Sequence, residues 1–276
     1  MNRIKSRGLS VIAILCVILL LFTSCHSFEN TQDVIPIIDA VAFEYKDLSV
    51  SANRVSRDDT KGISVEFSIE NNSTYEYEIS STAVIINNGM TDLTYEFVIE
   101  GKERSIDQLY IPFETIEFAG IIEVGYIEIY FDVQNLTTNE SITNAGVLTV
   151  KLSEPSLPMV SGHILYDQHG IKIYGQYVDE TTVWGSSVLL YVQNTSDKNI
   201  IVYCEQVSFN DCEVASDYNE FIYANKHSVD NIPLASTNMN VNEINSSESI
   251  VLKLKIIDSD TMNVIDETPP IGFYAN

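Results

Sequence analysis

The sequence aligns with itself, without a gap, at an offset of 123 residues from about residue 43 to residue 142. Identical residues recur at this offset, for example Asn71 with Asn194 and Tyr95 with Tyr218. The apolar positions keep one register over the whole span, which indicates that one folding unit was duplicated. Whatever fold one copy adopts, the other is expected to adopt it as well.

Apolar and polar residues alternate within each copy. Val65, Phe67 and Ile69, for example, are separated by single polar residues. A period of two is typical of a strand with one buried and one solvated face. The pattern predicts strands at residues 48–51, 64–70, 77–86, 95–99, 106–111, 126–133 and 147–152. In the second copy it predicts them at residues 171–177, 188–194, 200–209, 221–223, 228–234, 250–257 and 271–274.

Short strands separated by Asn, Gly and Asp turns favour a β-sandwich in each copy. We therefore expect an all-β chain with two tandem immunoglobulin-like β-sandwich domains, at residues 43–152 and 163–276. Residues 153–162, which include Pro155 and Pro158, are the expected linker. Only residues 114–120 and their equivalents, 237–243, are expected to form a helical turn.

The N-terminus has the organisation of an export signal. Residues 1–8 carry three basic and no acidic side chains, and an apolar run follows at residues 9–22. That run has 14 residues, fewer than the roughly 20 that a membrane-spanning helix needs. A basic start, a short apolar run and small residues before a break predict a signal peptide at residues 1–24.

The end of this signal resembles a bacterial lipobox, Leu21-Phe22-Thr23-Ser24-Cys25. The resemblance implies cleavage after Ser24 and a diacylglycerol, with palmitate-type chains, on the sulfur of Cys25. Two acyl chains anchor a protein stably, whereas one is marginal. Residues 25–42 would then be a lipidated polar tether, and the protein would lie on the extracytoplasmic face of the cell membrane. An ordinary cleaved signal and an uncleaved anchor remain the alternatives.

The charge of the chain restricts its partners. There are 39 acidic and 15 basic residues, and loss of residues 1–24 would take the formal charge from -24 to -27. Such an acidic surface repels phosphate backbones and anionic headgroups, so we expect no nucleic-acid partner. Attachment to a membrane must come from the lipid rather than from surface charge. The hydrophobic content of 45% is enough to build a core.

Several runs of the second copy resemble a repeat found in lipoproteins of Firmicutes: Trp184-Gly185, Gln193-Asn194-Thr195-Ser196-Asp197-Lys198-Asn199-Ile200, Val207-Ser208-Phe209-Asn210 and Asp258-Ser259-Asp260-Thr261. The resemblance covers most of the second copy and, more faintly, the first. It implies a location, a fold and a single-membrane host, but it implies no reaction and no catalytic residues. The first copy departs from it at Lys61, which stands where the second copy has Trp184.

Two features are candidate ligand sites. Oxygen atoms are available at nearby positions from Asp258, Asp260 and Asn263, which form a weak candidate Ca²⁺ site. The segment lacks the Gly and the distal Glu of an EF-hand loop. Solvated turn residues are the alternative. The single tryptophan, Trp184, is either an exposed platform for a sugar or a residue that packs on the core. No other cofactor is expected.

Cys204 and Cys212 follow the signal and the lipidation site along the chain. Eight residues of extended chain would hold them ~25 Å apart. We therefore expect free or buried thiols rather than a disulfide.

The histidine and glycine spacings match no zinc site, nucleophile elbow or phosphate-binding loop. The sequence therefore favours a non-catalytic, surface-anchored lipoprotein that binds or scaffolds an extracellular protein or carbohydrate. One alternative is an enzyme with its site at the interdomain groove, around Tyr166, His169 and His227. Another is a passive structural spacer.

Overall fold

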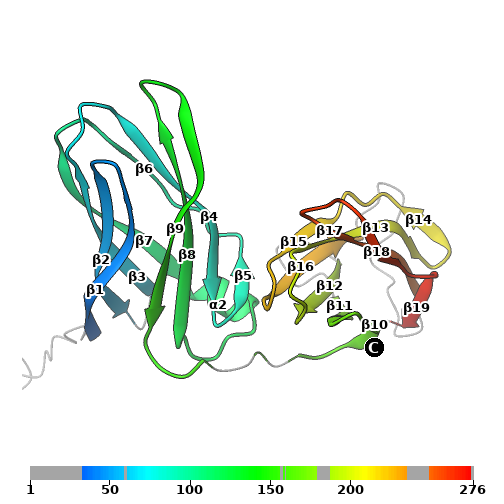
Figure 1. The fold of residues 1–276 in the computed structure, drawn as a ribbon. Coiled ribbons are helices and arrows are strands. Elements are labelled where there is room, and N and C mark those ends of the chain that lie inside the picture. The colour runs from blue at the N-terminus through cyan, green and yellow to red at the C-terminus, as the bar shows by residue number, and fades with distance from the viewer. Residues whose placement is uncertain are drawn as a thin grey trace, which may run out of the picture.

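The computed structural model describes residues 33–58, 61–155, 158, 160–178, 187–234 and 249–274 (Figure 1). Over these residues the chain is all-β apart from one short helix, α2 (Phe113–Phe118). The strands form a four-stranded, a nine-stranded and a six-stranded sheet. The prediction of an all-β chain is confirmed.

The strands of the first copy are β1 (Asp33–Tyr45), β2 (Leu48–Asp58), β3 (Gly62–Asn71), β4 (Tyr77–Ile86), β5 (Gly89–Thr91), β6 (Glu96–Ile99), β7 (Arg104–Pro112), β8 (Tyr126–Asn135) and β9 (Glu140–Lys151). The four-stranded sheet has the order β1-β2-β3-β7. The other five strands of the copy belong to the nine-stranded sheet, in which β5, β4, β8 and β9 are neighbours and β6 also pairs with β4.

The strands of the second copy are β10 (His163–Gln168), β11 (Ile171–Val178), β12 (Ser187–Asn194), β13 (Ile200–Phe209), β14 (Cys212–Val214), β15 (Asn219–Ile222), β16 (His227–Pro233), β17 (Ser249–Asp258), β18 (Val264–Glu267) and β19 (Ile271–Tyr274). β10, β11, β12 and β16 complete the nine-stranded sheet. The six-stranded sheet has the order β14-β13-β17-β18, with β15 on β13 and β19 on β17.

The backbone repeats at the offset that the sequence predicts. Both bounds of β4, β5, β6 and β8 lie 123 residues before those of β13, β14, β15 and β17. The long β9 differs, because its counterpart is divided into β18 and β19 by Pro269 and Pro270. Proline has no N–H to donate to a strand ladder, so the ladder is interrupted there.

Each copy has its own core. In the first, Phe67 of β3 meets Phe131 of β8 edge to face, with ring centroids 5.9 Å apart, so the core lies between the four-stranded sheet and part of the nine-stranded one. In the second, Tyr177 of β11 stacks on Phe209 of β13 at 6.4 Å. Val65 and Ile69 are fully buried, as the alternation predicts.

A duplicated asparagine closes the same turn in both copies. Asn71 donates from its side chain to the carbonyl oxygens of Tyr75 and Glu100, at 2.7 and 2.9 Å. Its Oδ1 accepts from the backbone N–H and the hydroxyl of Ser73. Asn194 makes the four equivalent bonds 123 residues further along. A buried amide needs this complete set of partners, which explains why the asparagine recurs.

The folded part of the chain begins earlier than expected. β1 starts at Asp33, inside residues 25–42, and pairs with β2 from the outset, for example Ile35 with Val55. The tether boundary at residue 42 therefore needs correction. The sequence does indicate this strand, because residues 34–38 read Val-Ile-Pro-Ile-Ile. Such an apolar run favours a strand over a polar tether.

The helical turn predicted at residues 114–120 is confirmed by α2, which follows Pro112 and buries Ile116. Its predicted equivalent at residues 237–243 lies outside the described residues. In the part of the chain that is described, no helix has the length and apolar character required to cross a bilayer.

Candidate functional site

The two copies meet where strand β16 reaches strand β5 (Figure 1). His227, the first residue of β16, pairs in parallel with Gly89, and its backbone N–H donates to the carbonyl oxygen of Asn88 at 2.9 Å. This bridge joins four strands of the second copy to five of the first in the nine-stranded sheet. The copies therefore share one hydrogen-bonded sheet.

Glycine at position 89 permits this approach. A Cβ there would lie only 2.8 Å from Nε2 of His227. The imidazole of His227 is buried against the ring of Tyr191, with centroids 5.3 Å apart. Burial, followed by the positive charge of Lys226, lowers the pKa of His227 to about 4. The ring is therefore neutral at physiological pH and acts as a packing element of the junction.

An ion pair crosses the same junction. Nζ of Lys226 contacts Oε2 of Glu128, and both side chains are only 11% exposed. Nζ also donates to Oδ1 of Asn88 at 3.1 Å. Beside this pair, the rings of Tyr130 and Tyr223 stack at 4.9 Å with an interplanar angle of 15°. A buried charge pair with this geometry fixes the orientation of the two copies, because separating the copies would leave each charge without its partner.

A cavity of about 430 Å³ lies at the junction and is lined by both copies. Three carboxylates face it: Asp92 from the first copy, and Glu220 and Asp230 from the second. The hydroxyl of Ser228 donates to Glu220. Burial, and then the neighbouring negative charges of Asp230 and Asp92, raise the pKa of Glu220 to about 7. This carboxyl is thus partly protonated near neutral pH.

A second cavity, of about 490 Å³, is lined in part by residues of β13 and β17. Tyr203, Lys255 and Met262 line it, together with Cys204. Burial raises the pKa of the Cys204 thiol to about 11, so it is a poor nucleophile at neutral pH. Cys204 and the exposed Cys212 are both free thiols, as predicted.

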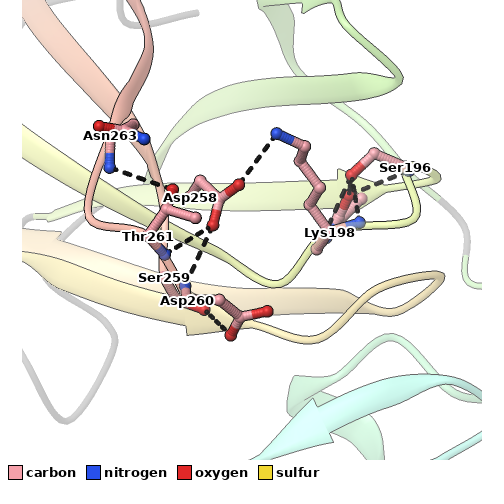
Figure 2. Close-up of polar contacts among 8 residues, drawn as sticks. Ser196, Lys198, Asp258, Ser259, Asp260, Thr261 and Asn263 are labelled. Atoms are coloured by element: carbon pink, nitrogen blue, oxygen red, sulfur yellow. Dashed lines mark hydrogen bonds and ion pairs between the residues drawn. The ribbon is translucent and has the colours of Figure 1, made fainter.

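Asp258 organises a turn (Figure 2). Its Oδ1 accepts the backbone N–H groups of Asp260 and Thr261 at 3.1 and 3.0 Å, and its Oδ2 lies 2.9 Å from Nζ of Lys198. These contacts, Lys198 first, lower the pKa of Asp258 to about 2. Within the described residues, no group of three or more His, Cys, Asp or Glu side chains is placed to hold a metal ion.

The first copy builds the same turn without a charge. Asn135, the counterpart of Asp258, accepts the N–H groups of Thr137 and Thr138, both at 2.9 Å. These contacts support the turn interpretation of Asp258, Asp260 and Asn263. The asparagine at the matching position shows that the turn itself requires no carboxylate.

The structure brings two of the three proposed enzyme residues together. The hydroxyl of Tyr166 donates to Asp266 at 2.9 Å, and Nε2 of His169 lies 3.8 Å from the same carboxylate. His227 lies instead at the junction, against Tyr191. Of the predicted group, His227 is thus the member at the junction between the copies, whereas Tyr166 and His169 share Asp266, and the structure does not bring the three together. Trp184 and Cys25, the proposed sugar platform and lipidation site, lie outside the described residues.

Strand β7 presents an open edge. One side of it pairs with β3 over its whole length, from Arg104 opposite Glu70 to Pro112 opposite Gly62. In the described part of the chain, no strand pairs with its other side. Ile106 is 66% exposed and Tyr110 42%. The alternation predicted this strand but not its place at the margin of the sheet, because an edge is a property of the topology.

No family model matches this chain, and no curated protein matches it.

Proposed function

We propose that the protein is a non-catalytic lipoprotein, held outside the cytoplasm by a diacylglycerol on Cys25, that binds another protein along the edge of β7. The observation that carries the proposal is this edge, with Ile106, Gln108 and Tyr110 exposed on one face of the strand. The alternating exposure presents a row of side chains beside backbone groups that no described strand occupies.

An edge strand is a template for a strand from another chain, because its N–H and C=O groups on one side lack partners. Proteins usually protect such edges with charges, and this chain has 39 acidic and 15 basic residues to draw on. Residues 105–111 nevertheless contain a single charged side chain, that of Asp107. An edge that lacks this protection is suited to pairing with a partner.

We further propose that both copies are immunoglobulin-like domains. In the first copy β3 pairs with β7 in one sheet, and β4 pairs with β8 in the other. The chain thus crosses to the other sheet after β3, returns for β7 and crosses again for β8, which is a Greek-key connection of the kind found in that architecture. The second copy repeats it, since β12 pairs with β16 and β13 with β17.

The junction supports a scaffolding role for the same molecule. The buried pair of Lys226 and Glu128 favours one orientation of the copies over others. This feature also favours the second candidate function, a passive spacer that holds its far end away from the membrane. The two functions differ in whether the β7 edge has a partner in the intact envelope.

A photoreactive amino acid at position 108 of the full-length protein distinguishes them. In intact cells, we expect irradiation to produce a covalent adduct with a protein from position 108. The same group at position 147, where Val147 is 40% exposed on β9, should not produce one. Equal adduct yields from both positions, or no adduct from either, would contradict the binding function. The passive spacer would then be the remaining candidate function.

The matched substitutions are Ile106→Lys, on the edge, and Ile122→Lys, at a position that is 71% exposed and lies outside the strands. A lysine at the edge places a charge where a partner strand would pack. We expect Ile106→Lys to abolish the adduct from position 108 and Ile122→Lys to preserve it. Loss of the adduct with both substitutions would contradict a site on β7.

A further inference from the structure

We infer that the partner at the β7 edge is a second copy of this chain, with β7 pairing antiparallel to β7 about a two-fold axis at Gln108. This inference rests on the proposed function, since it names the occupant of the same edge. It would join two four-stranded sheets, one from each molecule, into one continuous sheet.

The exposed face of β7 is self-complementary in this register. Centring the pairing on Gln108 places Ile106 opposite the partner's Tyr110, and Tyr110 opposite the partner's Ile106. These are the exposed apolar residues of the strand, at 66% and 42%. An aromatic side chain opposite a β-branched one is a favourable cross-strand pair. At the axis, Gln108 meets its own copy, and an amide can both donate and accept.

Neighbouring registers lack this match. A pairing centred on Asp107 would place two like charges directly opposite each other, which is unfavourable. A pairing centred on Ile106 would set Tyr110 opposite the partner's Lys102 and leave its ring without an apolar neighbour. Because register follows the side-chain pattern, the centre at Gln108 is favoured.

Repeating the internal junction between molecules is a poorer alternative. It would place β14 of one molecule on β7 of another, as β5 lies on β16 within one chain. The counterparts of Lys226 and Glu128 are Glu103 and Val251, so the ion pair would be lost. Cys212 stands where the junction requires a glycine. These differences disfavour head-to-tail association of molecules through a β14–β7 contact.

Two-fold pairing closes on itself, because each molecule uses its single β7 edge for the other. Both molecules would be anchored in the same membrane, where confinement raises their effective concentration. Their formal charges, -27 for each chain once residues 1–24 with three basic side chains are lost from a total of -24, repel one another. Salt screens this repulsion, so we expect added salt to favour the pair.

Disulfide trapping tests the register directly. Gln108→Cys is made in the full-length, membrane-anchored protein with Cys212→Ser, which removes the exposed free thiol. Residues directly opposite in an antiparallel pair have Cα atoms about 4.5–5.5 Å apart, within reach of a disulfide. Mild oxidation should therefore produce a covalent homodimer from position 108.

The matched control is Ile106→Cys in the same background. In the inferred register its partner is Tyr110, and the two copies of position 106 are four residues apart, ~13 Å along the strand. We expect no homodimer from it. Adding Ile106→Lys to Gln108→Cys should reduce the amount of trapped dimer about tenfold or more. The two-fold axis makes a lysine replace the apolar contact with Tyr110 at two places in each dimer. Thermal unfolding of each variant verifies that it is folded.

The outcomes separate the two proposals. Trapping at position 106 as efficiently as at 108 would overturn the inferred pairing. A photo-adduct from position 108 with a different protein, and no homodimer, would also overturn this inference while supporting the proposed function. Absence of both the adduct and the homodimer, from folded protein, would overturn both.

Discussion

At the scale of single residues, the junction cavity holds a carboxyl whose ionisation the fold opposes. The pKa of Glu220 is raised from 4.5 to about 7, because the side chain is buried near Asp230 and Asp92. A carboxyl with a raised pKa in the folded state destabilises that state when it ionises. The cost is absent below about pH 4.5, grows as the pH rises, and is complete above about pH 7.

Glu220→Gln should therefore stabilise the protein at pH 8 and have little effect at pH 4.5. The amide still accepts from Ser228, and we expect a gain of about 2–3 kcal/mol at pH 8, given ~1.4 kcal/mol per pKa unit. Thermal or denaturant unfolding at both pH values measures it. Glu213→Gln, at an exposed position, is the control, and an equal gain at both pH values for Glu220→Gln would contradict this account.

The turn at Asp258 leads to a second prediction. Because Asn135 builds the same turn in the first copy, Asp258→Asn should leave the melting temperature nearly unchanged at neutral pH, whereas Asp258→Ala should lower it. If the carboxylate serves only the turn and Lys198, excess calcium and a chelator should give the same melting temperature for the wild type. A calcium-dependent rise that Asp258→Asn removes would instead establish the candidate metal site.

At the scale of strands, alternation predicted the elements that bury one face, such as β3 with Val65 and Ile69. It did not predict β5 and β14, because three residues are too few to show a period. It also did not predict the junction. Lys226 and Glu128 have Glu103 and Val251 as counterparts. A comparison of the two copies therefore could not indicate that Lys226 and Glu128 are in contact.

The junction ion pair yields a prediction at this scale. Glu128→Gln leaves the ammonium group of Lys226 buried without a counter-charge, which typically costs about 3–5 kcal/mol. Lys226→Met added to Glu128→Gln should recover much of that loss, a coupling that a double-mutant cycle measures. Glu205→Gln is the control, because its pair with Lys253 is 31% exposed on each side. Equal costs for Glu128→Gln and Glu205→Gln would contradict the role of the junction.

At the scale of the whole molecule, the repeat predicted two similar bodies, and the two cores and matching strand bounds agree with it. Candidate sites were harder to predict. The spacing of Asp258 and Asp260 suits an ion and a turn equally well, and only the backbone N–H groups distinguish them. His169 and His227 belong to the same copy but have different neighbours, Asp266 and Tyr191, and β11 and β12 lie between β10 and β16 in the sheet.

Membrane anchoring is tested at this scale by Cys25→Ser. We expect the wild-type protein to partition into the detergent phase and its N-terminal peptide to carry the mass of a diacylglycerol on Cys25. Cys25→Ser should remove both properties. Cys16→Ser, inside the apolar run of the signal, should preserve them. Identical partitioning of the Cys25→Ser variant and the wild type would contradict the lipid anchor.

The central claim is that β7 holds a protein in the native membrane, and backbone hydrogen exchange along residues 105–111 measures it most directly. On intact membranes, we expect these amides to exchange more slowly in the wild type than in Ile106→Lys, because a paired strand covers the outer edge. Ile122→Lys should match the wild type. Equally fast exchange in the wild type and Ile106→Lys would show that the edge is unoccupied and would contradict the claim.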